Sequence, residues 1–145
     1  MKLLVVNGVN MNMLGVREPE IYGTQTLPDI EEELREYGRQ RDCLIECVSS
    51  NIEGELVDFI QSAMGRYDGI ILNAGAYTHY SIAIRDAIAA VSVPTVEIHI
   101  SNVFARDFFR SVSIIAPVCV GSISGLGIYG YKAAIDFFTH SEVVN

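Results

Sequence analysis

Short apolar runs alternate with helix-like patterns along the whole chain. Runs without strict alternation are typical of strands buried on both faces of a sheet. They occupy residues 3–6, 44–48, 69–72 and 95–100, and a fifth lies within residues 113–120. Between them, apolar residues recur at helical spacing. The helices predicted from this spacing run from Thr26 to about residues 38–42 and over residues 81–91, 103–110 and 129–138. One more helix is predicted to be capped by Ser50 and Asn51 and to extend to Ala63.

The order of these segments predicts the fold class. Strands separated by helices of this length form parallel βαβ units with right-handed crossovers. We therefore expect a flavodoxin-like three-layer α/β/α fold with a five-stranded parallel sheet, as a single domain over residues 1–145. The first helix also has a clear start, with Thr26 as N-cap, Pro28 in the first turn and Asp29 at the third position.

Composition favours an oligomeric protein of the cytoplasm. Half of the 145 residues are hydrophobic and 19% are charged, which excludes a disordered chain. The positive mean hydropathy is high for a small monomer, and subunit interfaces are the usual place for additional apolar surface. The apolar runs are too short to cross a bilayer, and no charged leader with a long apolar stretch precedes the first strand.

Charge and side-chain chemistry argue against several classes of function. A net charge of −8 disfavours nucleic acid as a partner, although a local arginine cluster can still attract a small anion. Cys43, Cys47 and Cys119 lack the spacing of a disulfide framework or a metal site, so we expect reduced thiols and no metal. The lysines, Lys2 and Lys132, lie near the ends of the chain, and neither suits Schiff-base chemistry.

Polar residues gather where three predicted strands end. Asn7 and Asn10 follow the first strand, residues 73–79 follow the third, and residues 97–102 end the fourth. In an open parallel sheet, ligands bind at the carboxyl ends of the strands. Glycine lets backbone amides approach a ligand, and asparagine both donates and accepts hydrogen bonds. We therefore predict the binding site at this edge of the sheet.

Glu97 and His99 form a candidate catalytic pair. They stand two residues apart on a strand and point to the same face, where a buried polar pair needs partners. Glu97 can accept from one ring nitrogen and leave the other free toward the cleft, which holds the histidine in a working tautomer. The alternative is a structural pair in the core, in which the two side chains only satisfy each other's hydrogen-bonding groups. The position at the end of the strand favours catalysis.

Residues 15–23 form a polar segment bracketed by glycines, with the pattern of a lid hinged at both ends. The segment carries Arg17 and Tyr22. A tyrosine serves as a base only where nearby cations favour its phenolate, and Arg17, Arg106 or Arg110 could supply that field. The alternative interpretation is a surface loop whose aromatic ring plugs the core.

Residues 125–130, Gly-Leu-Gly-Ile-Tyr-Gly, fit the alternating glycines of a dinucleotide-binding loop. The chain ends fifteen residues later, which leaves no room for a second strand with an acidic residue. We interpret the segment as a loop that lets the last helix pack closely on the sheet.

Taken together, these segments resemble the type II 3-dehydroquinate dehydratases over nearly the whole chain. The matching stretches are Asn-Gly-Val-Asn-Met-Asn-Met-Leu-Gly (residues 7–15), Arg-Glu-Pro-Glu-Ile-Tyr-Gly (17–23), Ser-Asn-Ile-Glu-Gly-Glu-Leu (50–56), Asn-Ala-Gly-Ala-Tyr-Thr-His (73–79), Glu-Ile-His-Ile-Ser-Asn (97–102), and Ala-Arg followed by Phe-Arg (105–106 and 109–110). Six stretches in this order form a specific signal.

The resemblance implies a lyase without metal or cofactor that converts 3-dehydroquinate to 3-dehydroshikimate by anti elimination through an enolate. By position, Tyr22 is similar to the base, Arg17 to the cation that favours its phenolate, and Asn73 to the group that stabilises the enolate through a water. His99, oriented by Glu97, is similar to the acid that protonates the departing hydroxyl. The implied substrate-binding positions are Asn10, Asn73, His79, Asp86, Ile100, Ser101, Arg106 and Arg110.

The family likeness also implies an assembly and two metabolic settings. Trimers packed into dodecamers are expected, with Asp86 reaching the site of a neighbouring subunit. The same step serves the shikimate pathway, for aromatic amino acid biosynthesis, and the breakdown of quinate.

The chain departs from the family pattern at a few positions around the expected site. Val9 stands where proline is usual and Ile52 where histidine is usual, and Phe104 and residues 111–112 replace a histidine-rich pattern. We expect these changes to affect affinity and subunit contacts more than the reaction. Two other hypotheses are a flavodoxin-like binding module without chemistry and a catalytically silent relative. A flavin module is disfavoured because the turn over residues 7–10 lacks a phosphate-binding cradle.

Overall fold

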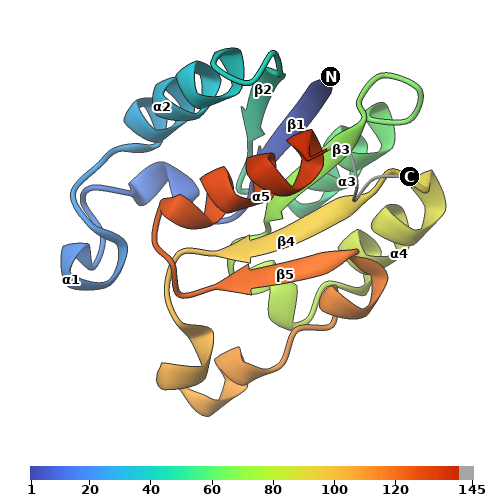
Figure 1. Ribbon diagram of the computed structural model, residues 1–145. Coiled ribbons are helices and arrows are strands. Elements are labelled where there is room, and N and C mark those ends of the chain that lie inside the picture. The colour runs from blue at the N-terminus through green and yellow to red at the C-terminus, as the bar shows by residue number, and fades with distance from the viewer. Residues whose placement is uncertain (141–145) are drawn as a thin grey trace.

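The computed structural model describes residues 1–140, which form one parallel sheet with helices on both faces (Figure 1). The strands are β1 (Lys2–Asn7), β2 (Leu44–Ser49), β3 (Gly69–Asn73), β4 (Thr95–His99) and β5 (Gly121–Ser124). Every pairing is parallel, and the order across the sheet is β2-β1-β3-β4-β5. This is the flavodoxin-like order, whose direction reverses between β1 and β3. The predicted fold class is confirmed.

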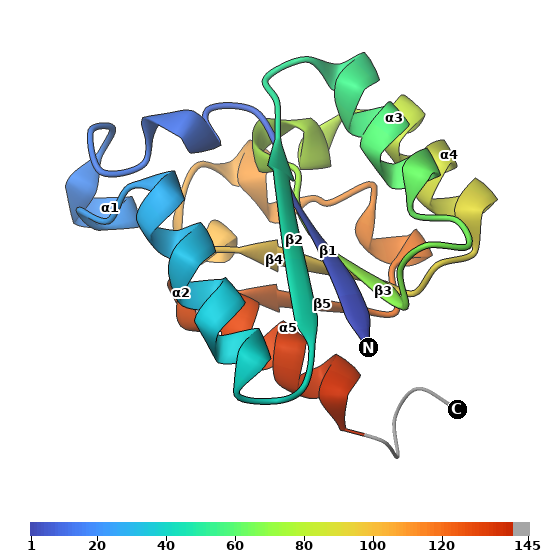
Figure 2. The ribbon, with the colours of Figure 1, turned by 90° about the horizontal axis from the view of Figure 1, so that it is seen from above.

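The helices form two layers (Figure 2). Helices α2 (Leu27–Arg39) and α5 (Tyr129–Thr139) cover one face of the sheet, and α3 (Glu53–Ser62) and α4 (Ile82–Val91) cover the other. The shorter elements are α1 (Pro19–Tyr22) and the 3-10 helices Met11–Met13, Gly75–His79, Val103–Ala105, Phe108–Ser111 and Ala116–Val118.

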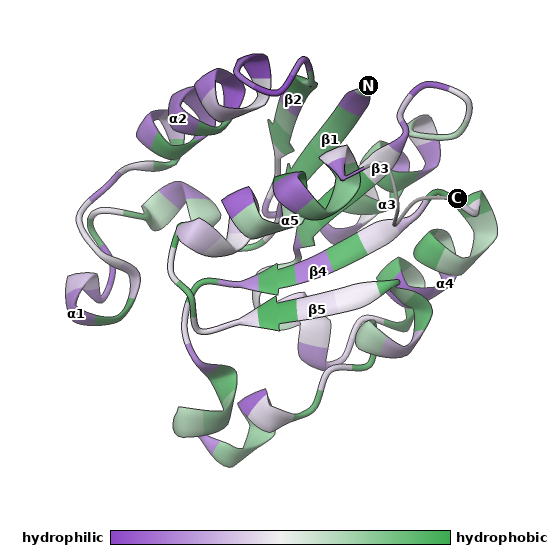
Figure 3. Ribbon diagram, viewed as in Figure 1, coloured by the Kyte–Doolittle hydropathy of each residue, from purple (hydrophilic) through white to green (hydrophobic). Residues whose placement is uncertain are grey.

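The apolar strand residues divide between two hydrophobic cores, because successive side chains point to opposite faces of the sheet. In β1, Leu3 and Val5 pack with α2 and α5, whereas Leu4 and Val6 pack with α3 and α4. Figure 3 shows the apolar strands in the centre and the polar outer side of α2. No helix within residues 1–140 combines the length and apolar character needed to cross a membrane.

Two helices begin with a side-chain cap, and the one at Thr26 was predicted. Thr26 and Asp29 form a reciprocal capping box, with the amide of Asp29 donating to Thr26 Oγ1 and the amide of Thr26 donating to Asp29 Oδ2. Ser81 Oγ accepts from the amide of Ile84 at the start of α4. The cap predicted for α3 is wrong, because the N-cap is Ile52, which has no side-chain acceptor.

The fifth strand was placed too early by the apolar pattern. It lies at Gly121–Ser124, after residues 113–120. Pro117, which lacks an amide proton, sits in the 3-10 helix that precedes it. The strand itself is Gly-Ser-Ile-Ser, which carries one apolar residue and so gives no hydrophobic run. An edge strand with polar neighbours does not need to be apolar.

Residues 103–110 also differ from the single short helix predicted there. Two 3-10 turns flank Arg106, whose backbone is extended with φ −110° and ψ −160°. The Asn102 side chain accepts from the amide of Phe104 at 3.1 Å and so caps the first turn. The break after that turn directs Arg106 toward the end of the sheet.

Candidate active site

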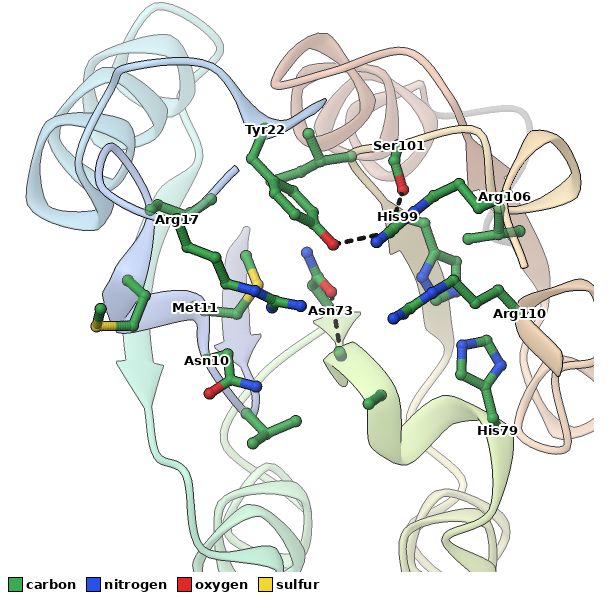
Figure 4. Close-up of a pocket in the computed structure, with 17 residues that line it drawn as sticks. Asn10, Met11, Arg17, Tyr22, Asn73, His79, His99, Ser101, Arg106 and Arg110 are labelled. Atoms are coloured by element: carbon green, nitrogen blue, oxygen red, sulfur yellow. Dashed lines mark hydrogen bonds between the residues drawn. The ribbon is translucent and has the colours of Figure 1, made fainter. Parts of the chain in front are cut away.

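A pocket opens at the carboxyl ends of β1, β3 and β4 (Figure 4). It encloses about 650 Å³, part of it open to solvent, a size that suits a small molecule. The predicted site residues that line it are Asn10, Arg17, Tyr22, Asn73, His79, His99, Ile100, Ser101, Arg106 and Arg110. Two predicted residues, Glu97 and Asp86, lie outside the lining.

Close backbone contact joins the loops that follow β1 and β3. The amide of Gly8 donates to the carbonyl oxygen of Asn73 at 2.7 Å, and a Cβ at Gly8 would lie 2.5 Å from the carbonyl oxygen of Ala74. Only glycine permits this approach. The loop after β2 adds a third support, since Asn51 Oδ1 accepts from the amide of Asn10 at 2.8 Å. Asn51 therefore braces the pocket wall and does not cap α3.

The segment between Gly15 and Gly23 brings Arg17 and Tyr22 to the pocket. Both glycines have positive φ, 87° and 83°, a backbone conformation that favours glycine and suits a hinge. The ring of Tyr22 also packs against the core between the sheet and its α2–α5 layer. The ring of Tyr22 therefore contacts the core while its hydroxyl faces the pocket.

Cations surround the Tyr22 side chain. Arg106 Nη1 donates to the Tyr22 hydroxyl at 2.7 Å and to Ser101 Oγ at 3.0 Å. The guanidinium carbons of Arg106 and Arg17 lie 5.3 and 5.5 Å from the centre of the Tyr22 ring. The carboxylate of Glu18 lies 3.5 Å from Arg17 and 3.8 Å from Arg106. The Tyr22 side chain therefore lies beside two guanidinium groups, both of which also contact Glu18.

His99 is held by Glu97 from the side away from the pocket. Its Nε2 lies 2.7 Å from Glu97 Oε1, and Glu97 is fully buried. Ser113 Oγ and Ser122 Oγ donate to the same carboxylate at 2.7 and 3.1 Å. Because an ionised carboxylate can only accept hydrogen bonds, Nε2 carries a proton and donates a hydrogen bond to Glu97. This bond fixes the orientation of the imidazole ring.

The hydrogen bonds to Glu97 lower its pKa by more than its burial raises it. Burial alone would raise the pKa of this carboxyl, but the donors His99, Ser113 and Ser122 together lower it below its ordinary value. Glu97 is therefore ionised at neutral pH although its side chain is fully buried. A buried negative charge next to His99 can stabilise positive charge on the imidazole ring.

Asn73 lies at the end of β3, in the middle of the pocket wall (Figure 4). Its Oδ1 accepts from the amide of Gly75 at 3.2 Å, and its Nδ2 donates to the hydroxyl of Tyr131 at 3.1 Å. The side chain is 3% exposed. The second N–H of this carboxamide has no acceptor among residues 1–140, and Asn73 is one of the residues that line the pocket.

The pocket is electropositive although the chain carries a net charge of −8. Arg17, Arg106 and Arg110 all line it, and among residues 1–140 no aspartate or glutamate does. His79 lines the opposite wall, where its Nδ1 lies 2.7 Å from the carbonyl oxygen of Val112. Such a site attracts a small anion, in agreement with the sequence argument for a local arginine cluster.

The other titratable candidates lie away from this chemistry. Asp86 is exposed on α4. Burial raises the pKa of the Cys47 and Cys119 thiols to about 12, so both stay protonated. Within the described part of the chain, no cluster of histidine, cysteine and acidic side chains has the arrangement of a metal site.

Sequence patterns did not reveal several supporting residues. Ser113 and Ser122 fall in segments whose register was not predicted, and Asn7 and Tyr131 are joined only by the fold. The polar positions of β5 were the one available signal, because a strand with serines beside a buried glutamate can supply donors.

Comparison with known proteins places this chain in a family. A family model described as Dehydroquinase class II matches residues 1–139. The 3-dehydroquinate dehydratase of a Nitratiruptor species is 54% identical over 135 residues, covering 93% of this chain and 86% of that protein. That of a Type A strain of Clostridium perfringens is 51% identical over 137 residues, covering 94% of each.

Solved structures agree with the sequence matches. The type II dehydroquinase from Butyrivibrio crossotus DSM 2876 superimposes with a TM-score of 0.93 at 48% identity, covering 95% of this chain and 97% of that one. A 3-dehydroquinate dehydratase-like protein from Bifidobacterium longum is more distant, with a TM-score of 0.72 at 30% identity, covering 97% and 96%.

Proposed function

This chain belongs to the class II dehydroquinase family, whose reaction is the dehydration of 3-dehydroquinate, and we propose that Tyr22 and His99 are the base and the acid of that reaction. The observation that carries the assignment is that Arg106 bonds the Tyr22 hydroxyl in the same pocket where Glu97 orients His99. The product is 3-dehydroshikimate, formed by anti elimination through an enolate in a single catalytic domain, residues 1–145.

Tyr22 removes the proton alpha to the ketone. Such a proton is weakly acidic, so the base must carry negative charge when it acts. The hydrogen bond from Arg106 and the nearby guanidinium of Arg17 support a phenolate at this position. A positioned base contributes about 10²–10⁴-fold to the rate.

Asn73 stabilises the enolate, through a bound water, by offering an N–H donor. Its oxygen is already bonded to the amide of Gly75, so nitrogen is the part of the side chain left for the developing oxyanion. Preorganised donors at such a charge contribute about 3–4 kcal/mol each.

His99 protonates the departing hydroxyl. Its Nε2 is engaged by Glu97, which leaves Nδ1 as the nitrogen that can deliver a proton. Glu97 acts through His99 and does not line the pocket, so it is a positioning residue. The water released in this step takes its second proton from the acid, and the electrons of the enolate form the new C=C bond.

The arginines and polar groups of the wall hold the substrate. 3-Dehydroquinate carries a carboxylate and several hydroxyls, which match a cationic site with amide and hydroxyl partners. The residues assigned to binding are Asn10, Asn73, His79, Ile100, Ser101, Arg106 and Arg110. Neither a metal nor a cofactor is needed for these steps.

The protein works as a homo-oligomer in the cytoplasm, most simply as a dodecamer built from trimers. Support comes from the segment between β4 and β5, where Phe104 is 71% exposed and Phe108 is 88% exposed. Burying such rings is the usual reason for subunit contact. In that assembly Asp86 reaches the pocket of a neighbouring subunit. The pathway is the shikimate route to aromatic amino acids or the breakdown of quinate.

Turnover of 3-dehydroquinate by purified, chelator-treated protein tests the proposal. The absorbance of the conjugated product reports the reaction, and a parallel sample contains borohydride. We expect turnover that neither treatment reduces, because no step passes through a metal or a Schiff base. No turnover by folded, assembled protein would overturn the assignment and direct attention to the substitutions at Val9, Ile52 and Phe104.

A further inference from the structure

A buried hydroxyl links the ends of two neighbouring strands beneath the pocket. Asn7 and Asn73 are register partners on β1 and β3, and the hydroxyl of Tyr131, from α5, lies between their side chains. Tyr131 is fully buried in the core between the sheet and its α2–α5 layer. Its ring packs as other aromatic rings in the core do, but a buried hydroxyl needs hydrogen-bond partners.

The two hydrogen bonds of this hydroxyl have a defined direction. Tyr131 Oη donates its one proton to Asn7 Oδ1 at 2.5 Å. Its oxygen can then only accept, and it accepts from Asn73 Nδ2 at 3.1 Å. Burial raises the pKa of Tyr131, so the hydroxyl keeps its proton and the direction is maintained.

The opposite end of the Asn73 amide is fixed by the backbone. Its Oδ1 accepts from the amide of Gly75 at 3.2 Å, so a flipped side chain would set its NH2 against an N–H donor and its oxygen against the Tyr131 oxygen. Both partners therefore select one orientation, in which nitrogen is the group left for a ligand. The flipped amide would offer a carbonyl acceptor in place of the N–H donor to the bound water that faces the enolate.

Asn7 adds an independent observation. Its side chain is completely buried, and its Nδ2 has no hydrogen-bond partner within residues 1–140. An unpaired buried amide nitrogen is destabilising. The oxygen of Asn7 explains an asparagine at this position, because it accepts the hydrogen bond of Tyr131. It thereby sets the direction of the hydrogen bonds that run from Asn73 through Tyr131 to Asn7.

We propose that Tyr131, directed by Asn7, is a positioning residue that holds the Asn73 carboxamide with its nitrogen as a fixed donor toward the pocket. This inference rests on the role proposed above for Asn73. Tyr131 touches neither the pocket nor the substrate and acts only through Asn73.

The first test compares Tyr131→Phe with Tyr37→Phe. Tyr37 is the matched control, because its hydroxyl also bonds a side chain, that of Asp136, but it lies far from the pocket between α2 and α5. We expect kcat for 3-dehydroquinate to fall about tenfold to a hundredfold in Tyr131→Phe with KM changed much less, and to stay near the wild-type value in Tyr37→Phe. Equal effects of the two variants on kcat would overturn the proposal.

Asn7→Leu gives a second test that does not depend on the tolerance of position 131. This change removes the acceptor of Tyr131 together with the unpaired buried nitrogen. The freed hydroxyl can then donate toward Asn73, which favours the wrong amide orientation. We expect kcat to fall while the thermal midpoint is kept or raised, a combination that a purely structural role would not produce. Unchanged kcat in a folded Asn7→Leu protein would contradict the proposal.

A measurement on ligand-free protein separates this inference from the proposed function. The side-chain NH2 signals of Asn73 in 15N-labelled protein, assigned through their loss in Asn73→Ser, should shift and exchange faster with solvent in Tyr131→Phe but not in Tyr37→Phe. Unaltered signals would refute the positioning role even if the enzyme is active. Altered signals in a protein that does not turn over 3-dehydroquinate would support the positioning role and contradict only the proposed reaction.

Discussion

Arg106 donates a 2.7 Å hydrogen bond to the hydroxyl of Tyr22, although 84 positions separate the two residues in the chain. Tyr22 comes from the glycine-bracketed segment after β1, and Arg106 from the break between two 3-10 turns after β4. The bond therefore joins two walls of the pocket. It also distinguishes Arg106, which bonds the oxygen, from Arg17, which lies near the ring.

Tyr22→Phe should nearly abolish turnover. The variant keeps the ring that packs on the core and loses only the oxygen that takes the proton. We expect kcat to fall by about 10²–10⁴-fold, with substrate binding largely kept. Steady-state kinetics and a binding titration measure the two effects. Tyr67→Phe is the control, because its hydroxyl bonds the Glu46 carboxylate and neither residue lines the pocket. A near-normal rate in Tyr22→Phe would refute its assignment as base.

Arg106→Lys should lower kcat although the charge is kept. One nitrogen of Arg106 bonds both Tyr22 and Ser101, and a lysine ammonium on a flexible stem does not reproduce this placement. We expect a loss of about 10²-fold, of the size found when a donor at a reacting charge is removed. The matched control is Arg66→Lys, which lies away from the pocket beside Tyr67. Comparable rates in the two variants would show that charge alone is sufficient.

Glu97→Gln should flatten the dependence of stability on pH. The pKa of Glu97 is lowered in the folded protein, so the unfolded chain takes up the proton first as the pH falls. The stabilisation by the carboxylate is complete above the unfolded pKa of about 4.3 and is lost as the pH drops through the folded value. Urea unfolding between about pH 6 and pH 3 should show a shallower decline for the variant.

The same substitution should also lower activity, because His99 loses the acceptor that orients its ring. Glu55→Gln on the exposed side of α3 removes the same charge elsewhere and is the control. If the stability of Glu97→Gln depends on pH as the wild type does, the pKa of Glu97 is not lowered in the folded protein and the prediction is wrong.

Phe108→Ser should weaken the assembly and leave the fold intact. Phe108 is 88% exposed in the single chain, so its removal deletes no core contact. We expect sedimentation to shift from the oligomer toward smaller species, while Met64→Ser, at an exposed position next to the end of α3, leaves it unchanged. A wild-type protein that sediments as a monomer would refute the proposed dodecamer outright.

Local patterns were sufficient for most of the architecture. The four apolar strands and the cap of α2 follow from spacing that acts within one element. The pattern misplaced β5 because an edge strand of small polar residues carries no hydrophobic run. It also merged two 3-10 turns into one helix, since local spacing does not reveal the extended backbone at Arg106.

The sequence by itself determined the fold class and the edge of the sheet where the polar residues gather. Both depend on periodicity and on residue types at strand ends, which act over a few positions. The family came from the resemblance of six stretches of the chain to known members. Only the tertiary structure decided which arginine bonds Tyr22, which serines hold Glu97, and that Tyr131 joins Asn7 to Asn73. Each of these contacts joins distant segments, and its geometry depends on how helices and loops pack on the sheet, which no local pattern encodes.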